Sequence, residues 1–113
     1  MDALTATFSA LADPTRRAML TRLGQGPATV NQLAEPFPLS LPTVSRHLKV
    51  LEAAGLVSKS REAQFRTCKL EPERLVEAIG WMATCRSFFD TRFDRLEAQL
   101  ASRADAAHDE GNQ

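Results

Sequence analysis

Apolar residues recur every three or four positions over most of the chain, which is the period of an amphipathic helix. The first such stretch, residues 2–12, carries Leu4, Phe8 and Leu11. A second helix is predicted after Asp13, because aspartate caps helix N-termini and Pro14 suits the first helical position, where no amide donor is needed. The glycines and the proline within residues 24–27 end this helix.

The next two apolar stretches are separated by a proline-containing turn. A short helix is expected around residues 30–34, and "EPFPLS", residues 35–40, cannot remain helical because it holds two prolines. Ser40 is predicted to cap the following helix, whose inward stripe is Val44, Leu48 and Leu51. Gly55 ends that helix, since glycine readily adopts the left-handed conformation found at helix C-termini.

An alternating pattern replaces the helical one in "LVSKSREAQFRTCKL", residues 56–70. Two short strands are predicted at about residues 56–60 and 65–70, around a polar turn at 61–64. Because side chains alternate along a strand, one face of the second strand carries Arg66, Cys68 and Leu70. The pattern therefore predicts a β-hairpin.

A long helix is predicted over residues 73–101, after Pro72. Its main apolar line follows alternating steps of four and three, and Arg86 interrupts it once; the line consists of Leu75, Ile79, Met82, Phe89, Phe93, Leu96 and Leu100. A second, shorter line beside it consists of Trp81, Cys85 and Phe88. One small core cannot cover both lines, so this helix is expected to meet a second copy of the chain.

Length and composition fit one small domain followed by a tail. Residues 1–101 are expected to form the domain, and the polar, acidic residues 102–113 a flexible tail. The sequence has no stretch of 18 apolar residues, so no membrane span is predicted. It shows no basic segment followed by an apolar one at its start, so no secretion signal is predicted. The two cysteines show no metal or redox spacing, and a cytoplasmic location is expected.

Charge is unevenly distributed, although the net charge of the 113 residues is zero. Residues 40–70 hold six cations against two acids, a net charge of +4, whereas residues 71–113 hold five cations against nine acids, a net charge of −4. A basic segment in a chain of zero net charge indicates a polyanionic partner. The basic segment contains the helix that starts at Ser40 and the hairpin.

Two helices joined by a short turn and followed by a two-stranded ribbon define a winged helix-turn-helix, a mainly α fold with a small β-hairpin. In this fold the second helix enters the DNA major groove with hydroxyls and cations on its outer side, and the hairpin, or wing, meets the adjacent backbone. Solvated surface charges are the alternative reading of Arg46 and Lys49. For His47, which borders the apolar stripe, packing or hydrogen bonding is the alternative to metal ligation. The residues predicted to contact DNA are Ser40, Pro42, Thr43, Ser45, Arg46, His47, Lys49, Lys59, Arg61 and Arg66.

Three segments, "LADPTRRAML", "LSLPTVSRHLKVLEAAGLV" and "REAQFRTCKL", resemble the ArsR-type family of small bacterial winged-helix repressors over roughly residues 5–100. The resemblance implies a homodimer that binds an imperfect palindrome and blocks transcription, with the first and last helices forming the dimer interface. The residues predicted to lie in that interface are Leu4, Phe8, Leu11, Trp81, Cys85, Phe88, Phe89, Phe93 and Leu96.

The sequence departs from the family at its metal sites. Where many members carry a cysteine pair, this chain has Thr29, Val30 and Asn31, and its one C-terminal histidine, His108, lies in the acidic tail. No metal and no cofactor are therefore expected. Cys68 is expected to be core filler, and Cys85 to be core or interface.

The sequence thus predicts a DNA-binding transcriptional regulator, most simply a repressor that binds duplex DNA with an inverted repeat as a homodimer. Two alternatives remain at this point. One is a regulator of the same fold whose thiols sense metal, metalloid or oxidant, and the other is a protein-interaction module that does not bind DNA. An enzyme is not expected, because no nucleophile–base pair, phosphate loop or ligand-spaced His/Asp/Glu cluster occurs. The sequence names no small-molecule effector.

Overall fold

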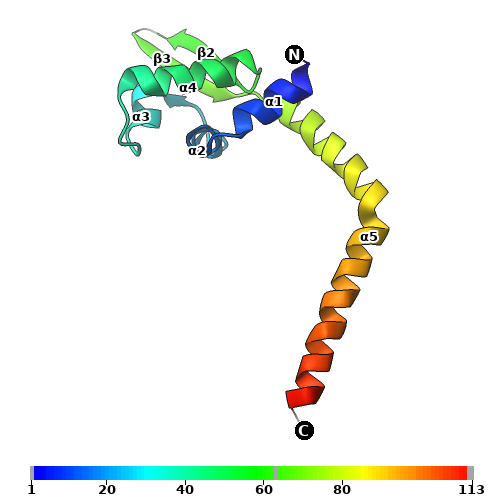
Figure 1. Cartoon of the computed structure of the whole chain (residues 1–113). Helices are drawn as coiled ribbons and strands as arrows, with labels where there is room; N and C mark the ends of the chain where they lie inside the picture. The colour runs from blue at the N-terminus through cyan, green and yellow to red at the C-terminus, as the bar shows by residue number, and fades with distance from the viewer. Residues whose placement is uncertain (1, 63, 112–113) are drawn as a thin grey trace. The chain divides into compact units, whose positions relative to one another are not determined.

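The computed structural model describes residues 2–62 and 64–111 (Figure 1), with side chains described for all of these except residue 62 and residues 106–111. The chain forms two compact units, Met1–Ile79 and Gly80–Gln113. The first unit holds four helices, a three-stranded sheet and the start of a fifth helix, in the order α1, α2, β1, α3, α4, β2, β3, α5. The second unit holds the remainder of α5.

The helices of the first unit begin where side chains cap them. α1 (Ala3–Leu11) starts after Asp2, whose carboxylate accepts the Thr5 amide at 2.7 Å, and α2 (Pro14–Leu23) after Asp13, which accepts the Arg16 amide at 2.9 Å. α4 (Leu41–Ala53) starts after Ser40, as predicted, and Gly55 follows its end with a φ of +77°. This positive φ favours glycine, which explains why the helix ends there.

α3 (Val30–Ala34) owes its start to a capping box. The Thr29 hydroxyl accepts the Gln32 amide at 3.1 Å, and the Gln32 side chain accepts the Thr29 amide at 2.9 Å. This reciprocal pair satisfies two amides that a helix N-terminus leaves without backbone partners. The predicted short helix at residues 30–34 is confirmed.

The sheet is antiparallel and has the strand order β1-β3-β2. β2 (Val57–Glu62) and β3 (Phe65–Leu70) form the predicted hairpin, although β2 runs two positions beyond the predicted end at residue 60. β1 (Ala28–Thr29) was not predicted; it pairs Ala28 with Cys68 and Thr29 with Thr67. The strand therefore ties the start of α3 to the wing.

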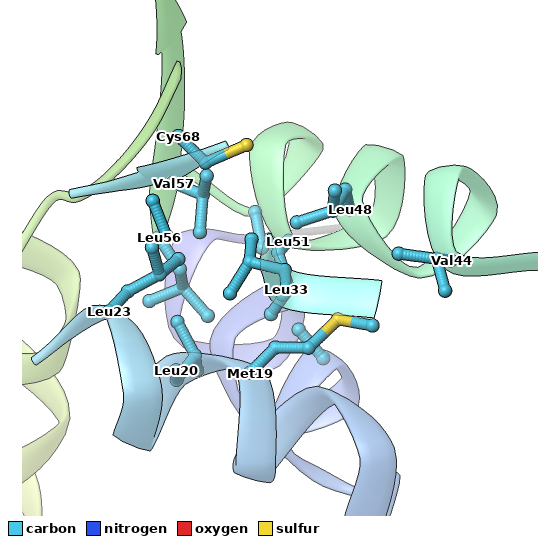
Figure 2. Packing of buried hydrophobic residues seen from close by; sticks show 13 residues of the cluster. Met19, Leu20, Leu23, Leu33, Val44, Leu48, Leu51, Leu56, Val57 and Cys68 are labelled. Carbon is cyan, nitrogen blue, oxygen red and sulfur yellow. The ribbon is translucent and has the colours of Figure 1, made fainter. Parts of the chain in front are cut away.

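The core lies between the helices and the inner face of the hairpin (Figure 2). The α4 stripe is confirmed, since Val44, Leu48 and Leu51 are fully buried. They meet side chains from α2, α3 and the hairpin, which are Met19, Leu20, Leu23, Leu33, Leu56, Val57 and Cys68. Fully burying one such aliphatic side chain contributes about 1.5–3 kcal/mol, so this cluster fixes the orientation of α4 and leaves its opposite face to solvent.

α5 (Glu73–Gly111) is longer than predicted. The sequence placed its end at residue 101, but the helix continues through Gly111, because the alanine-rich run after residue 103 has high helix propensity even without an apolar stripe. The predicted tail of residues 102–113 therefore starts inside a helix, and residues 112–113 lie outside the described residues. No helix in the described part of the chain carries a stretch long and apolar enough to cross a bilayer.

Candidate nucleic-acid interface

The outer face of α4 carries the hydroxyl and cationic side chains predicted to read DNA. Because the helix buries Val44, Leu48 and Leu51, the positions between them turn away from the core. Arg46 and Lys49 are exposed, and Thr43 and Ser45 are half-buried. At the N-terminus of the helix, the Ser40 and Thr43 hydroxyls lie 2.9 Å apart and form a hydrogen bond, and Pro42 is exposed beside them.

The register of the hairpin places three cations of the wing, Lys59, Arg61 and Arg66, on one face, and Lys69 on the other. Lys59 pairs with Cys68 and Arg61 with Arg66, and paired residues in an antiparallel ladder project to the same side. Cys68 is fully buried against the core, so this is the side of the hairpin that α4 covers. Arg61 and Arg66 continue that face beyond the core and are exposed.

α4 and the wing together line a groove of about 420 Å³. Three cations project into it, Lys49 from α4, Lys59 from β2 and Arg66 from β3, and Ser45 adds a hydroxyl. We call this feature the basic groove; its lining residues are Thr29, Val30, Asn31, Ser45, Lys49, Lys59, Gln64, Phe65 and Arg66. Three positive charges around one groove suit a phosphate-bearing ligand.

Lys59 also has a partner inside the domain. Its ammonium lies 3.5 Å from the Glu52 carboxylate on α4, and its side chain is only 20% exposed. The ion pair connects the wing to α4, so Lys59 holds the two walls of the basic groove together as well as contributing charge to it.

His47 lies away from the basic groove. Its Nδ1 is 3.8 Å from Asp13 and 3.4 Å from an Arg16 guanidinium nitrogen, both at the start of α2. Arg16 also donates to the carbonyls of Ala10 and Ser9 at the end of α1. These contacts match the hydrogen-bonding role that the sequence offered against metal ligation, in which His47 connects α4 to the α1–α2 junction. Its contact with DNA stays a prediction.

Sequence reasoning missed several residues of the basic groove. Gln64 and Phe65 line it, and so do Thr29, Val30 and Asn31, which the sequence singled out only as the places of the missing metal cysteines. The Thr-x-x-Gln capping box was a usable local signal for the start of α3. The start of α3 lies near the wing because β1 pairs with β3. β1 has only two residues, which is too short for an alternating pattern that would predict a strand.

The two cysteines occupy different environments. Cys68 is fully buried in the first unit, and burial raises the pKa of its thiol above the ordinary value. Cys85 lies in the second unit and is half-buried. The thiolate is the reactive form of cysteine, so the environment of Cys68 disfavours the thiol-sensing alternative at that residue.

Cys68 is therefore expected to resist alkylation in the folded protein. Iodoacetamide at pH 8 should leave Cys68 unmodified in native protein and modify it fully once guanidinium unfolds the chain. Peptide mass spectrometry measures the labelled fraction at each cysteine separately, so Cys85 does not interfere. Rapid labelling of Cys68 in the native state would contradict the burial described here.

No group of three or more His, Cys, Asp or Glu side chains converges as a metal site within the described residues. Thr29, Val30 and Asn31, at the family's cysteine positions, carry no thiol or imidazole. His108 lies among residues whose side chains are not described. The expectation that the protein has no metal site stays a prediction.

The residues predicted for the dimer interface are distributed over both units. In the first unit, Leu4 and Phe8 are half-buried, and Leu11 packs against the core. In the second unit, Cys85 is half-buried, and the large apolar side chains remain exposed in one copy of the chain; they are Trp81, Met82, Phe88, Phe89, Phe93, Leu96 and Leu100. Soluble domains rarely expose so many large apolar groups, so these residues mark an interaction surface.

Comparison with known proteins agrees with this geometry. A family model described as a helix-turn-helix domain matches residues 11–59. The transcriptional repressor SdpR of Bacillus subtilis is 40% identical over 75 residues, which cover 66% of this chain and 83% of the repressor. An HTH-type transcriptional regulator of Mycobacterium tuberculosis is 47% identical over 68 residues, covering 60% of this chain and 64% of that regulator.

Solved structures give the same result. A crystal structure of an ArsR family transcriptional regulator superposes with a TM-score of 0.74 at 41% identity, covering 78% of this chain and 91% of the other. A homodimeric winged helix-turn-helix DNA-binding domain from Mycobacterium bovis gives a TM-score of 0.62 at 25% identity, covering 79% and 84% of the two chains.

The helix-turn-helix, the hairpin behind it and the basic groove between them define a winged helix-turn-helix protein. Such proteins bind duplex DNA and regulate transcription. Within this class the chain belongs to the ArsR family, as the extent of its similarity to SdpR and to the solved regulator shows. The predicted fold, family and role as a DNA-binding transcriptional regulator are confirmed.

Proposed function

We propose that the protein is a repressor that binds an inverted repeat in duplex DNA as a homodimer. The basic groove is the observation that carries this proposal, because it joins cations of α4 and of the wing in one concavity of about 420 Å³. α4 lies in the major groove, where the side chains at Ser40, Pro42, Thr43 and Arg46 face the bases. The wing follows the flanking backbone with Lys59, Arg61 and Arg66.

Within the basic groove, Lys49 and Arg66 bind a phosphate of the strand that passes between α4 and the wing. Both side chains line the groove from opposite walls, and the Ser45 hydroxyl and the Asn31 amide are placed there to donate hydrogen bonds. Lys59 contributes a weaker contact, since Glu52 already compensates its charge. In this arrangement the phosphate contacts position the protein on the DNA, and the N-terminal half of α4 reads the base sequence.

Two observations support the homodimer: the apolar residues of α1 and α5, and the two-fold symmetry of an inverted repeat, which needs a two-fold symmetric protein to read both half-sites. One recognition helix reads one half-site, and a two-fold dimer presents two such helices at the spacing of a helical turn of DNA. The similar domain of Mycobacterium bovis is described as homodimeric. Repression fits a dimer that occupies a promoter, and SdpR carries the name of a repressor. The relatives are named as regulators, and we infer no enzymatic activity for this chain.

Binding to duplex DNA with an inverted repeat is expected to depend steeply on salt. Each phosphate that a cation neutralises releases counterions, so log affinity should fall with log salt at roughly −0.9 per phosphate contact. The operator is first located by footprinting the protein on DNA upstream of its own gene. Fluorescence anisotropy then measures the Kd for this DNA at several salt concentrations between about 50 and 300 mM, from which the slope of log affinity against log salt is obtained. A scrambled duplex of equal length is the control. A flat salt dependence, or equal affinity for both duplexes, would contradict the proposal.

A further inference from the structure

α4 begins with a large apolar side chain that the domain leaves in solvent. Leu41 is the first residue of the helix and is 51% exposed. Among the described residues, the core cluster and the apolar side chains packed on it do not include Leu41. A single exposed leucine needs no explanation by itself, because apolar atoms make up much of every protein surface. What distinguishes Leu41 is its position on α4.

Leu41 lies on the same row of α4 as two residues of the basic groove. Side chains four positions apart are neighbours on a helix surface, so Leu41, Ser45 and Lys49 follow one another along α4. Ser45 and Lys49 line the basic groove, and Lys49 is exposed there. Leu41 therefore extends this row from the basic groove to the N-terminal end of the helix.

The two ends of this row meet different parts of duplex DNA. In the binding mode proposed above, Lys49 binds a phosphate, whereas the N-terminal residues of a recognition helix reach the base edges in the major groove. Those edges carry hydrogen-bond donors and acceptors and, in unmodified DNA, one apolar group, which is the C5-methyl of thymine. A leucine side chain makes no hydrogen bond, so against any other base edge it would cover polar atoms without replacing their water.

We propose that Leu41 packs on the C5-methyl group of a thymine in each half-site of the operator and so selects thymine at that position. The inference rests on the DNA binding proposed above and adds the base that this side chain reads. Pro42, the next residue, is also exposed. The first turn of α4 thus presents a small apolar surface beside the Ser40 and Thr43 hydroxyls, which are bonded to each other at 2.9 Å.

Leu41 can be changed without disturbing the fold. The start of α4 depends on the Ser40 hydroxyl, which accepts the Thr43 amide at 3.3 Å, and not on the side chain at position 41. Alanine has a slightly higher helix propensity than leucine, so Leu41→Ala should keep the helix. The variant is expected to unfold at the parental temperature, as circular dichroism would show, and a loss of DNA binding then reports a lost contact.

Replacing thymine by uracil in the operator tests the contact directly, because uracil forms the same hydrogen bonds as thymine and lacks only the methyl group. Thymines of the footprinted operator are replaced one symmetric pair at a time, and fluorescence anisotropy measures the Kd of the full chain for each duplex. Burying one methyl group strengthens binding about fourfold, so a pair of replacements, one in each half-site, should weaken binding by the parent protein about 15-fold.

The same duplexes identify the side chain that contacts the methyl group. Leu41→Ala should bind the uracil duplex and the unmodified operator with Kd values within about twofold of each other, because the methyl has lost its partner. The salt slope of this variant should equal that of the parent, since Leu41 neutralises no phosphate. Val50→Ala is the matched control, because Val50 is an apolar residue of α4 that is 41% exposed and lies outside the row. It should keep the parental sensitivity to uracil.

Three outcomes would overturn the inference. If the parent protein binds the operator with unchanged affinity after every thymine has been replaced by uracil, no methyl group is read, although the proposed function stands. If the loss on uracil persists in Leu41→Ala, another side chain contacts the methyl group, and the assignment to Leu41 is wrong. If footprinting finds no inverted repeat that the protein protects, the proposed function fails, and this inference fails with it.

Discussion

A chain carrying Phe93→Asp is expected to sediment as a monomer and to lose operator binding. Phe93 is 47% exposed in one copy and packs on Phe89 on the main apolar line of α5, so a second copy would bury most of its remaining surface. An aspartate there would place an unpaired carboxylate in an apolar contact, which costs several kcal/mol unless the contact opens. Because each copy reads one half-site, a monomer should bind the operator roughly 10³-fold more weakly, near its non-specific affinity.

The control for Phe93→Asp is Ala98→Asp, which adds the same charge to the same helix at a position outside both of its apolar lines. It should leave both the dimer and operator binding within a few-fold of the parent. Circular dichroism and thermal unfolding should show that the first unit of the Phe93→Asp chain remains folded, since Phe93 lies in the second unit. A Phe93→Asp chain that remains dimeric at micromolar concentration would show that another surface holds the two copies together.

Elements determined by local chemistry could be predicted from the sequence. Ser40 caps α4 because a serine hydroxyl accepts the Thr43 amide, and the apolar stripe at Val44, Leu48 and Leu51 requires a helix to become buried on one side. The alternation around Cys68 likewise placed that thiol inward, where the structure buries it. These signals lie within a few residues of the feature that they predict.

Features that depend on contacts between distant segments could not be predicted. β1 is a strand only because Ala28 and Thr29 pair with β3, some forty residues later in the sequence. The proximity of His47 to Asp13 and Arg16 needs the packing of α4 on α2, so no pattern near residue 47 indicates it. The end of α5 was also missed, because helix propensity continued after the apolar pattern had stopped.

The basic groove shows both cases. Ser45, Lys49, Lys59 and Arg66 were predicted as DNA contacts from residue type and segment charge, and the structure brings these four side chains together. Its opposite edge, with Asn31 near the start of α3, depends on β1 and has no charge signal. The residues of the candidate DNA interface were therefore easier to predict than the shape of the groove that they line. Their contacts with DNA remain a prediction.

Arg46→Ala is expected to weaken operator binding by about 1–3 kcal/mol, or about 5- to 150-fold, which is the usual value of a bidentate contact to a base. Arg46 is exposed on the outer face of α4, next to Ser45, which lines the basic groove. A guanidinium can donate two parallel hydrogen bonds to a guanine edge, whereas the hydroxyls nearby can donate only one each. Binding to random duplex DNA should fall much less, because it depends on phosphate contacts.

The matched change is Arg61→Ala, which removes the same side chain from the wing. Arg61 lies opposite Arg66 on the cationic face of the hairpin. Its loss should weaken operator and random DNA by similar factors and reduce the salt slope by about one phosphate contact. Anisotropy titrations of both variants against both duplexes measure the ratio of specific to random affinity. If Arg46→Ala leaves that ratio at the parental value while Arg61→Ala lowers it, sequence is read by the wing, and the roles proposed for α4 and the hairpin are reversed.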